Sequence, residues 1–442
     1  MAPDPAPQPA DANAQTVTRA FVLMLDGVPW AVMDSLHRAG HFRGFASPSR
    51  VLSTFPSLTT LAFRDIWRES PTRGYEERYF DRADNRLRGG AWDVLSGKES
   101  SEGFHRHVDV EGAPMVSGLA YAFPLRIAPI EYNELRQGVL ERLGRDSIVV
   151  AYSISTDAVA HAEGRGAQVA QVLRLETLVD EVRRRVPGVR VDIFSDHGND
   201  FVPSHRIALD VELRRAGFSP ADRLRRPGDV VIPRFGLVGS VAVYAATADR
   251  ARLAQALARA TGVEFAIWDS AGAVMVQSAG GRARVQADAA GARYRYTPEA
   301  GDPLRLAAAL ERLRAAGELD EAGFAPDTAW LRETLGTPWE DSLRRLILCS
   351  RGAVLNPATV LVSLSPGHHF GDPIGDAFTR MEGTHGSLRS SGSTAFLMST
   401  AGPRPAIVRS DDVLGWLPEG IQATTAVPGV RQATPAAEPR GS

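Results

Sequence analysis

Acidic residues and histidines stand directly behind three apolar segments of this sequence, at Asp26, at Asp157 with His161, and at Asp196 with His197. Carboxylate and imidazole groups together form a ligand set for zinc and similar divalent ions. Asp157 and His161 are four residues apart, so one helical turn would place both on the same face of a helix. Asp196 and His197 are adjacent, which suits a turn at the end of a strand. The pattern therefore predicts metal-dependent chemistry.

A hydroxyl group that could act as a nucleophile lies in the turn formed by residues 53–57, Ser-Thr-Phe-Pro-Ser. Proline is favoured in the first turn of a helix, and a threonine or serine before it can serve as the N-terminal cap. Residues 58–67 are predicted to form that helix, with Thr54 at its start. A hydroxyl at a helix N-terminus beside a metal would be activated for attack, and the helix dipole would attract phosphate.

The elements that must position these residues are short apolar runs bounded by turn residues, which are typical of strands buried on both faces. Three such strands are predicted at residues 21–25, 147–152 and 189–194. Residues 167–185 are predicted to form an amphipathic helix between the second and third strands. Strand, helix and strand at this spacing indicate a parallel unit. Since ligands bind beyond the carboxyl ends of the strands in open α/β sheets, the acids and histidines would meet there.

The rest of the chain is predicted to divide into a core and an insertion. Residues 359–363 and 393–398 are expected to be further strands of the main sheet. Between residues 247 and 348, predicted helices flank a segment of alternating apolar and polar residues that indicates antiparallel hairpins. We therefore predict an α/β core over residues 18–246 and 349–424 and a smaller α+β insertion or cap over residues 247–348. Residues 1–17 and 425–442 are expected to be a disordered leader and tail.

The composition excludes several classes of protein. The chain has 442 residues, with 50 basic and 52 acidic side chains and a net charge of -2. This near-neutral charge argues against a dedicated nucleic-acid binder, and no signal peptide or membrane-spanning segment is visible. Cys349 is the only cysteine, so cysteine-rich zinc and iron–sulfur sites are excluded. The compartment stays open between the cytoplasm and export with removal of a signal peptide.

Five short motifs follow one another along the chain. They are Asp26-Gly27, Thr54-Phe55-Pro56, Asp157-Ala-Val-Ala-His161-Ala-Glu-Gly164, Ser195-Asp196-His197-Gly198 and Thr384-His385-Gly386. Each motif is weak alone, but the ordered set is specific. In this order they resemble the alkaline phosphatase superfamily, and most of all its type I phosphodiesterase/nucleotide pyrophosphatase branch. The resemblance covers about residues 20–245 and 355–400.

The resemblance implies a mainly parallel central sheet with helices on both faces and a centre of two divalent metal ions, with zinc as the expected metal. One ion would be bound by Asp157, His161 and His385. The other would be bound by Asp26, Asp196, His197 and Thr54. In the implied reaction Thr54 attacks the phosphorus of a small-molecule phosphate ester. The resulting phospho-threonine is then hydrolysed by water.

The sequence departs from the family pattern near the phosphate-binding pocket. The phosphodiesterase branch carries an asparagine about twenty residues after the nucleophile, and here Arg78 is the candidate that could replace it, because guanidinium pairs well with phosphate oxygens. The asparagine that usually follows Thr-Phe-Pro is replaced by Ser57. A phosphomonoesterase or phosphonate hydrolase on the same core therefore stays an alternative to a phosphodiesterase. A degenerate metal-binding module without activity is the non-enzymatic alternative.

Overall fold

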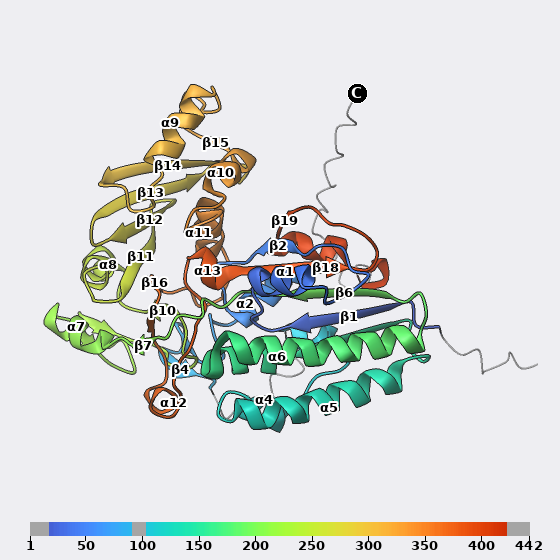
Figure 1. Ribbon diagram of the computed structural model, residues 1–442. Coiled ribbons are helices and arrows are strands. Elements are labelled where there is room, and N and C mark those ends of the chain that lie inside the picture. The colour runs from blue at the N-terminus through green and yellow to red at the C-terminus, as the bar shows by residue number, and fades with distance from the viewer. Residues whose placement is uncertain (1–16, 91–102, 422–442) are drawn as a thin grey trace, which may run out of the picture.

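The computed structural model describes residues 17–90 and 103–421, and its strands form two large sheets that lie next to each other (Figure 1). The predicted leader lies outside the described residues except for residue 17, and the predicted tail lies wholly outside them. Within the described part of the chain, no helix combines the length and apolar character needed to cross a membrane.

The first sheet has six strands in the order β19-β2-β18-β6-β1-β5. β1 pairs in parallel with both β5 and β6, and β18 is antiparallel to its neighbours β2 and β6. This sheet confirms the prediction of a mostly parallel main sheet. Its strands are β1 (Ala20–Leu25), β2 (Ser49–Leu52), β5 (Ile148–Ser153), β6 (Arg190–Ser195), β18 (Thr394–Ser399) and β19 (Ile407–Arg409).

Helices and 3-10 segments cover both faces of the main sheet because its strands are apolar on both sides. One face packs against α1 (Trp30–Arg38), α5 (Pro124–Arg142) and α6 (Ser155–Arg185), and the long α5 and α6 run alongside the sheet in Figure 1. The other face packs against α2 (Thr59–Ile66) and two 3-10 segments, which are η1 (Gly103–His107) and η3 (Ser410–Trp416).

The second sheet has seven strands in the order β10-β16-β11-β12-β13-β14-β15, and every neighbouring pair is antiparallel. The hairpins predicted within the insertion are therefore present. The sheet also takes in one strand on either side of residues 247–348. Its strands are β10 (Ser240–Val243), β11 (Val263–Ser270), β12 (Ala273–Ser278), β13 (Gly281–Ala287), β14 (Arg293–Ala300), β15 (Ala325–Pro326) and β16 (Val360–Leu364).

Helices also flank both faces of the second sheet, and short elements connect the two sheets. One face packs against α7 (Leu209–Arg215) and α8 (Arg250–Leu257). The other packs against α9 (Ala307–Ala315), α10 (Asp327–Thr334) and α11 (Ser342–Ser350). The remaining elements are β3 (Tyr79–Asp81), β4 (Arg86–Arg88), α4 (Pro114–Leu119), β7 (His205–Arg206), β8 (Ser219–Pro220), β9 (Asp229–Val230), η2 (Thr247–Asp249), β17 (His368–His369), α12 (Pro373–Phe378) and α13 (Ser390–Ser393).

One predicted strand joins the other sheet. Residues 393–398 return to the main sheet as β18, but the strand predicted at residues 359–363 is β16 of the second sheet, so its placement in the main sheet was wrong. The physical reason is that β16 is buried along its whole length. A continuous apolar run predicts burial on both faces but not the sheet in which the burial occurs.

Candidate metal centre

The carboxyl end of the main sheet brings the predicted acids together. Asp26 follows β1 and Asp196 follows β6, and the last residues of these two neighbouring strands are paired in register. Asp157 lies in the first turn of α6, which begins directly after β5 on the other side of β1. All three side chains are buried. The parallel order β6-β1-β5 therefore places three carboxylates at one edge of the sheet.

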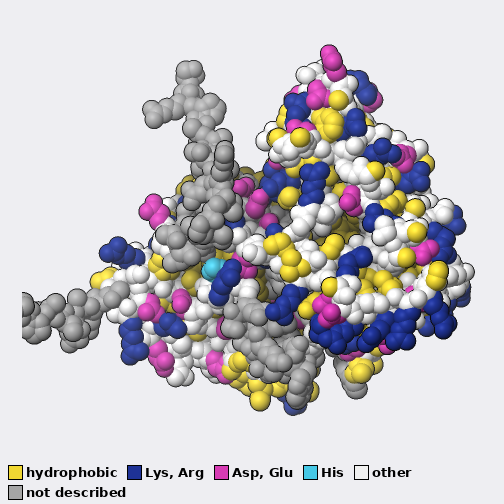
Figure 2. Space-filling view, turned by 180° about the vertical axis from the view of Figure 1, so that it is seen from behind, with side chains coloured by type: hydrophobic (Ala, Val, Ile, Leu, Met, Phe, Trp, Pro, Cys, Tyr) yellow, Lys and Arg dark blue, Asp and Glu magenta, His cyan; other side chains and the backbone are white. Residues whose placement is uncertain are grey.

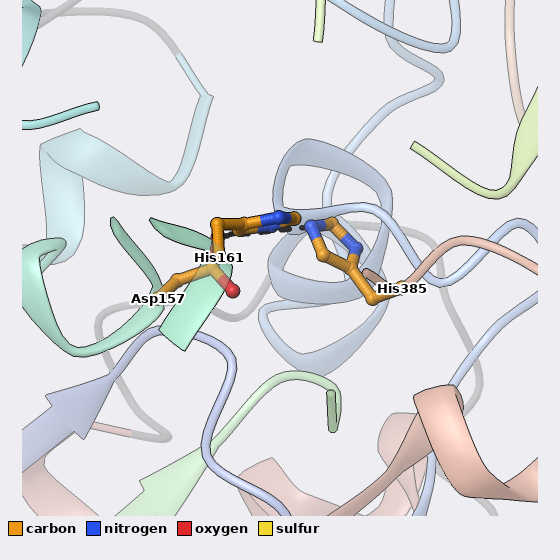
Figure 3. Close-up of side chains that lie close together, drawn as sticks. All are labelled: Asp157, His161 and His385. Carbon is orange, nitrogen blue, oxygen red and sulfur yellow. Dashed lines mark ion pairs between the residues drawn. The ribbon is translucent and has the colours of Figure 1, made fainter. Parts of the chain in front are cut away.

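The first of two groups of possible ligands contains Asp157, His161 and His385. His161 Nε2 lies 3.0 Å from Asp157 Oδ2, and His385 Nε2 lies 3.7 Å from the same oxygen. Asp157 and His161 share one face of α6, whereas His385 reaches them from a loop that precedes β18 (Figure 3). One ligand atom from each residue lies within 4.8 Å of the others, so this buried group has the size of a metal site.

The second group contains Asp26, Asp196 and His197. His197 Nε2 lies 3.4 Å from Asp26 Oδ1 and 3.3 Å from Asp196 Oδ2. The two groups adjoin, because the rings of His197 and His385 are stacked with their centroids 3.8 Å apart. Three protein ligands in each group would leave coordination positions open, as in catalytic zinc sites.

The electrostatics of the carboxylates fit a bound cation. Burial, together with the charges of Asp196 and Asp157, raises the pKa of Asp26 well above its ordinary value. Burial also raises the pKa of Asp196. The burial of Asp157 acts in the same direction, but the charges of His161 and His385 outweigh it and hold the pKa of Asp157 below its usual range. Such repulsion between buried acids is relieved when divalent metal ions bind between them.

Two buried carboxylate oxygens without a hydrogen-bond partner in the described part of the chain also favour bound metal ions. Asp157 Oδ1 and Asp196 Oδ2 are buried, and neither accepts a hydrogen bond from the described residues. A buried carboxylate oxygen without a partner is costly in free energy, and a metal ion would satisfy it. The two groups therefore fit divalent metal ions in their donor chemistry, their burial and their unsatisfied atoms.

Backbone carbonyls orient two of the histidines toward the centre. His385 Nδ1 lies 2.8 Å from the carbonyl oxygen of Ser57, and His197 Nδ1 lies 2.9 Å from that of Gly198. Each contact favours the tautomer that carries its proton on Nδ1, which leaves the Nε2 lone pair facing the acids. Outer hydrogen bonds of this kind fix the ring orientation of metal-binding histidines.

Two tyrosines and one glycine support the acids. Tyr152 donates to Asp26 Oδ2 at 2.6 Å, and Tyr121 donates to Asp157 Oδ2 at 2.9 Å. The backbone N–H of Gly27 donates to Asp196 Oδ1 at 3.2 Å, and a Cβ atom at residue 27 would lie 2.2 Å from Asp157 Oδ1. The acids are thus held in place by Gly27, which belongs to the Asp26-Gly27 motif, and by two tyrosines outside the five motifs.

The threonine hydroxyl that contacts this centre belongs to Thr59. Thr59 Oγ1 lies 3.2 Å from Asp26 Oδ1 and 3.2 Å from His197 Nε2. Thr54, the predicted nucleophile and metal ligand, donates its hydroxyl to the carbonyl oxygen of Pro56 instead. The predicted cap is also wrong, because α2 begins at Thr59 with Leu58 at its N-cap. The proline lies in the turn before the helix rather than in its first turn.

The remaining predicted substrate contact, Arg78, lies at a small cavity next to α2. Arg78 is exposed and lines a small cavity together with Leu58, Glu76 and Tyr79. Within the described residues it makes no hydrogen bond or ion pair with the six acids and histidines of the centre. Its role in phosphate binding stays a prediction.

Sequence reasoning found the six acids and histidines but missed Thr59, Tyr121 and Tyr152. The available signal for Thr59 was a second pair of hydroxyl residues, Thr59-Thr60, at the start of the predicted helix. The two tyrosines had no local signal, since each reaches its acid from a distant part of the chain.

Comparison with known proteins gives similarity at the level of structure. No family model and no curated protein matches the sequence. A crystal structure of phosphonoacetate hydrolase from Sinorhizobium meliloti, bound to phosphonoformate, is similar with a TM-score of 0.50 and 12% identity, over 93% of this chain and 97% of that chain. Human ectonucleotide pyrophosphatase/phosphodiesterase 5 is similar with a TM-score of 0.49 and 11% identity, over 92% and 95% of the two chains. The similarity to phosphonoacetate hydrolase shows that this chain shares the fold of that protein.

Proposed function

We propose that the protein is a metal-dependent hydrolase of phosphate esters in which Thr59 is the nucleophile. The position of the Thr59 hydroxyl supports this proposal most directly, because it lies 3.2 Å from one acid and 3.2 Å from one histidine of the candidate metal centre. The fold shared with phosphonoacetate hydrolase is consistent with it. Thr59 thereby replaces Thr54 as the proposed catalytic residue and as the proposed hydroxyl ligand of a metal.

Two divalent ions, with zinc as the expected metal, would be held by Asp157, His161 and His385 and by Asp26, Asp196, His197 and Thr59. Bound ions of this kind lower the pKa of hydroxyl groups and offset the negative charge that develops on phosphoryl oxygens. The donor set and the two unsatisfied carboxylate oxygens support this assignment.

The chain itself orients the nucleophile. Thr59 is the first residue of α2, so its hydroxyl lies at the positive end of the helix dipole, where an alkoxide and a phosphate are both stabilised. Asp26 Oδ1 is positioned to accept the hydroxyl hydrogen, which fixes the orientation of the Thr59 hydroxyl.

The reaction has two steps. Thr59 Oγ1 attacks phosphorus and loses its proton, the bond from phosphorus to the leaving oxygen breaks, and the departing alcohol is protonated. Water then attacks the phospho-threonine, which releases phosphate or a phosphate monoester and restores the hydroxyl. This covalent route is typical of hydroxyl nucleophiles activated next to a metal.

A phosphodiester or nucleotide pyrophosphate is the first candidate substrate, in line with the motif order. Phosphonate hydrolysis is the second candidate, because the crystal structure with the similar fold is a phosphonoacetate hydrolase. Rates on bis-p-nitrophenyl phosphate, p-nitrophenyl phosphate and phosphonoacetate, measured under the same conditions, distinguish a diesterase from a monoesterase and from a phosphonate hydrolase.

The central experiment compares the two threonines. Purified protein loaded with zinc is assayed on these substrates before and after treatment with a chelator, next to Thr59→Ala and Thr54→Ala. We expect Thr59→Ala to lose at least about 1,000-fold in kcat and Thr54→Ala to retain most of its activity. The opposite order would return the nucleophile to Thr54. Activity that survives both chelation and Thr59→Ala would contradict the proposal.

Metal analysis separates an enzyme from an inactive metal-binding module. About two zinc ions per chain with turnover support the proposal, whereas bound zinc without turnover on any of the three substrates supports the module.

A further inference from the structure

Arg345 lies on α11, at the junction between the two sheets (Figure 1). Its side chain is buried, at 4% exposure. A buried guanidinium is costly unless its N–H groups and its charge are compensated. The charge of the neighbouring Arg344 is compensated by an ion pair with Asp411. Arg345 forms no ion pair with any of the described residues, so its contacts need another explanation.

Backbone carbonyl oxygens are the partners of Arg345. Nη2 donates to the carbonyl of Thr54 at 3.0 Å, and Nη1 donates to the carbonyl of Leu388 at 2.8 Å. A longer contact of 3.3 Å joins Nη1 to the carbonyl of Glu340, which lies just before α11. One side chain of the second sheet's flanking helix therefore holds two loops that belong to the main sheet.

Both loops lead to the candidate metal centre. Thr54 opens the turn that ends at Thr59, and Leu388 follows His385 by three residues. The same loops are tied to each other at Ser57, whose carbonyl lies 2.8 Å from His385 Nδ1 and whose hydroxyl accepts from the Gly386 N–H at 3.1 Å. Ser57 fixes the loops beside the centre, and Arg345 fixes them on the side of α11.

We propose that Arg345 is a positioning residue that holds the Thr59 turn and the His385 loop in one relative arrangement, and so connects the second sheet to the metal centre. This inference rests on the proposed function of Thr59. Arg345 acts through the backbone of the two loops and touches none of the reacting atoms. The role requires arginine, because a planar guanidinium donates in two directions at once and the ammonium group of lysine is a single point charge.

The test compares Arg345→Lys with Arg344→Lys, which changes the adjacent arginine of the same helix. Among the described residues, Arg344 pairs with Asp411 and donates no hydrogen bond to either loop. Hydrogen exchange is followed by mass spectrometry in the metal-loaded wild type and in both variants, and kcat and KM are measured on bis-p-nitrophenyl phosphate. For Arg345→Lys we expect faster exchange confined to residues 54–59 and 385–388. We also expect kcat to fall by about 10- to 100-fold with KM within about twofold, the range typical of outer-shell positioning groups. Arg344→Lys should leave both readouts near the wild-type values.

Chemical rescue provides a second readout that a loss of stability alone would not produce. Thr54, Arg345 and Cys349 line a common cavity, so removal of the Arg345 side chain would leave room for a small cation. We expect guanidinium at non-denaturing concentration to restore part of the kcat of Arg345→Ala, and sodium chloride at the same ionic strength to restore none. If Arg345→Lys does not fold, Arg345→Gln takes its place in the exchange and kinetic measurements with the same expected results.

Two outcomes would overturn the inference. One is an Arg345→Lys protein whose loop exchange and kcat match the wild type. The other is an Arg344→Lys protein that changes as much as Arg345→Lys, which would show a general loss of stability. Failure of the proposed function is a different result, namely a wild type that neither binds zinc nor hydrolyses the substrates. Hydrogen exchange measured in the metal-free wild type and variants would then still decide whether Arg345 holds the two loops.

Discussion

At the scale of single residues, the position where α2 begins decides which threonine hydroxyl meets the candidate metal centre. Thr54 and Thr59 are five residues apart and both lie near Pro56, so residue type alone does not distinguish them. Because α2 begins at Thr59, this hydroxyl meets Asp26 and His197, and the hydroxyl of Thr54 is used within its own turn. The functional assignment therefore depends on a helix boundary, which is the least reliable part of any sequence-based prediction.

Gly27 tests whether Asp157 is a metal ligand. Residue 27 has a φ of +64°, and an added Cβ would lie 2.2 Å from Asp157 Oδ1. We expect Gly27→Ala to displace this carboxylate and to lower zinc affinity by about tenfold or more, measured by calorimetric titration of the metal-free protein. Gly144→Ala is the matched control, because Gly144 has a φ of +81° and no atom within 4 Å of the added Cβ. Equal zinc affinity in Gly27→Ala and the wild type would remove Asp157 from the ligand set.

Glu76 gives the protein a pH-dependent loss of stability. Burial and the neighbouring charge of Glu77 raise the pKa of Glu76 from 4.5 to about 8. The unfolded chain therefore ionises at lower pH than the folded protein, and this group lowers the free energy of unfolding progressively between pH 4.5 and about 8. We expect the free energy of unfolding of Glu76→Gln to exceed that of the wild type by up to about 4 kcal/mol at pH 8 and by little at pH 4.5, measured by urea unfolding. A stability difference between the two proteins that stays constant over this pH range would contradict the assignment.

At the scale of elements, the centre depends on where strands end and on where α6 begins. β6, β1 and β5 are parallel neighbours, so their carboxyl ends deliver Asp196, Asp26 and the start of α6 to one edge. Gly164, the last residue of the Asp-x-x-x-His-x-x-Gly motif, adopts a non-helical conformation inside α6. The motif thus occupies a short first segment of α6. This segment ends at Gly164, directly after the turn that carries His161.

Glu131 holds the start of this segment. Its buried carboxylate, on α5, accepts hydrogen bonds from the Ser153 hydroxyl and from the backbone N–H groups of Ile154 and Ser155. A negative charge at this end of α6 is stabilising, and an amide side chain cannot accept all three bonds. We expect Glu131→Gln to lower the free energy of unfolding by about 1–3 kcal/mol in urea and to weaken zinc binding.

An exposed glutamate on the same helix provides the control for that change. Glu141 is exposed and its carboxylate accepts from Gln137 one turn earlier. We expect Glu141→Gln to change the free energy of unfolding by less than about 0.5 kcal/mol and zinc binding not at all. If Glu131→Gln lowers the free energy of unfolding no more than Glu141→Gln does, then the start of α6 does not depend on Glu131.

At the scale of the whole molecule, the two sheets are joined by buried and half-buried charged groups as well as by packing. Arg409 of β19 in the main sheet pairs with Asp327, the first residue of α10, and with Asp341, which directly precedes α11. Nearby, Arg50 of β2 pairs with Glu340. The same junction contains Arg345, so the relative placement of the sheets bears directly on the loops around the metal centre.

Breaking the Arg409 network should be costly because Asp341 is buried. We expect Arg409→Met to lower the free energy of unfolding by about 3 kcal/mol, since it leaves the Asp341 carboxylate without its partner. The double variant Arg409→Met/Asp341→Asn should regain a large part of this loss. Arg136→Met, which removes a surface partner of Glu181, should lower the free energy of unfolding far less, because water screens an exposed ion pair. Equal losses in Arg409→Met and Arg136→Met would show that the junction contributes no more than a surface pair.

Local sequence was sufficient for features that depend on a few neighbouring residues. Apolar runs ending in Asp26 and Asp196, the four-residue spacing of Asp157 and His161, and the alternation behind the hairpins of the second sheet were all predictable, because periodicity and turn chemistry act over short distances. The three-dimensional fold was needed for contacts between distant segments. It assigned β16 to the second sheet, brought Thr59 rather than Thr54 to the acids, and placed Tyr121 on Asp157 and Arg345 on the two loops. These contacts follow from how separate elements pack against each other, and no pattern within any one segment specifies that packing.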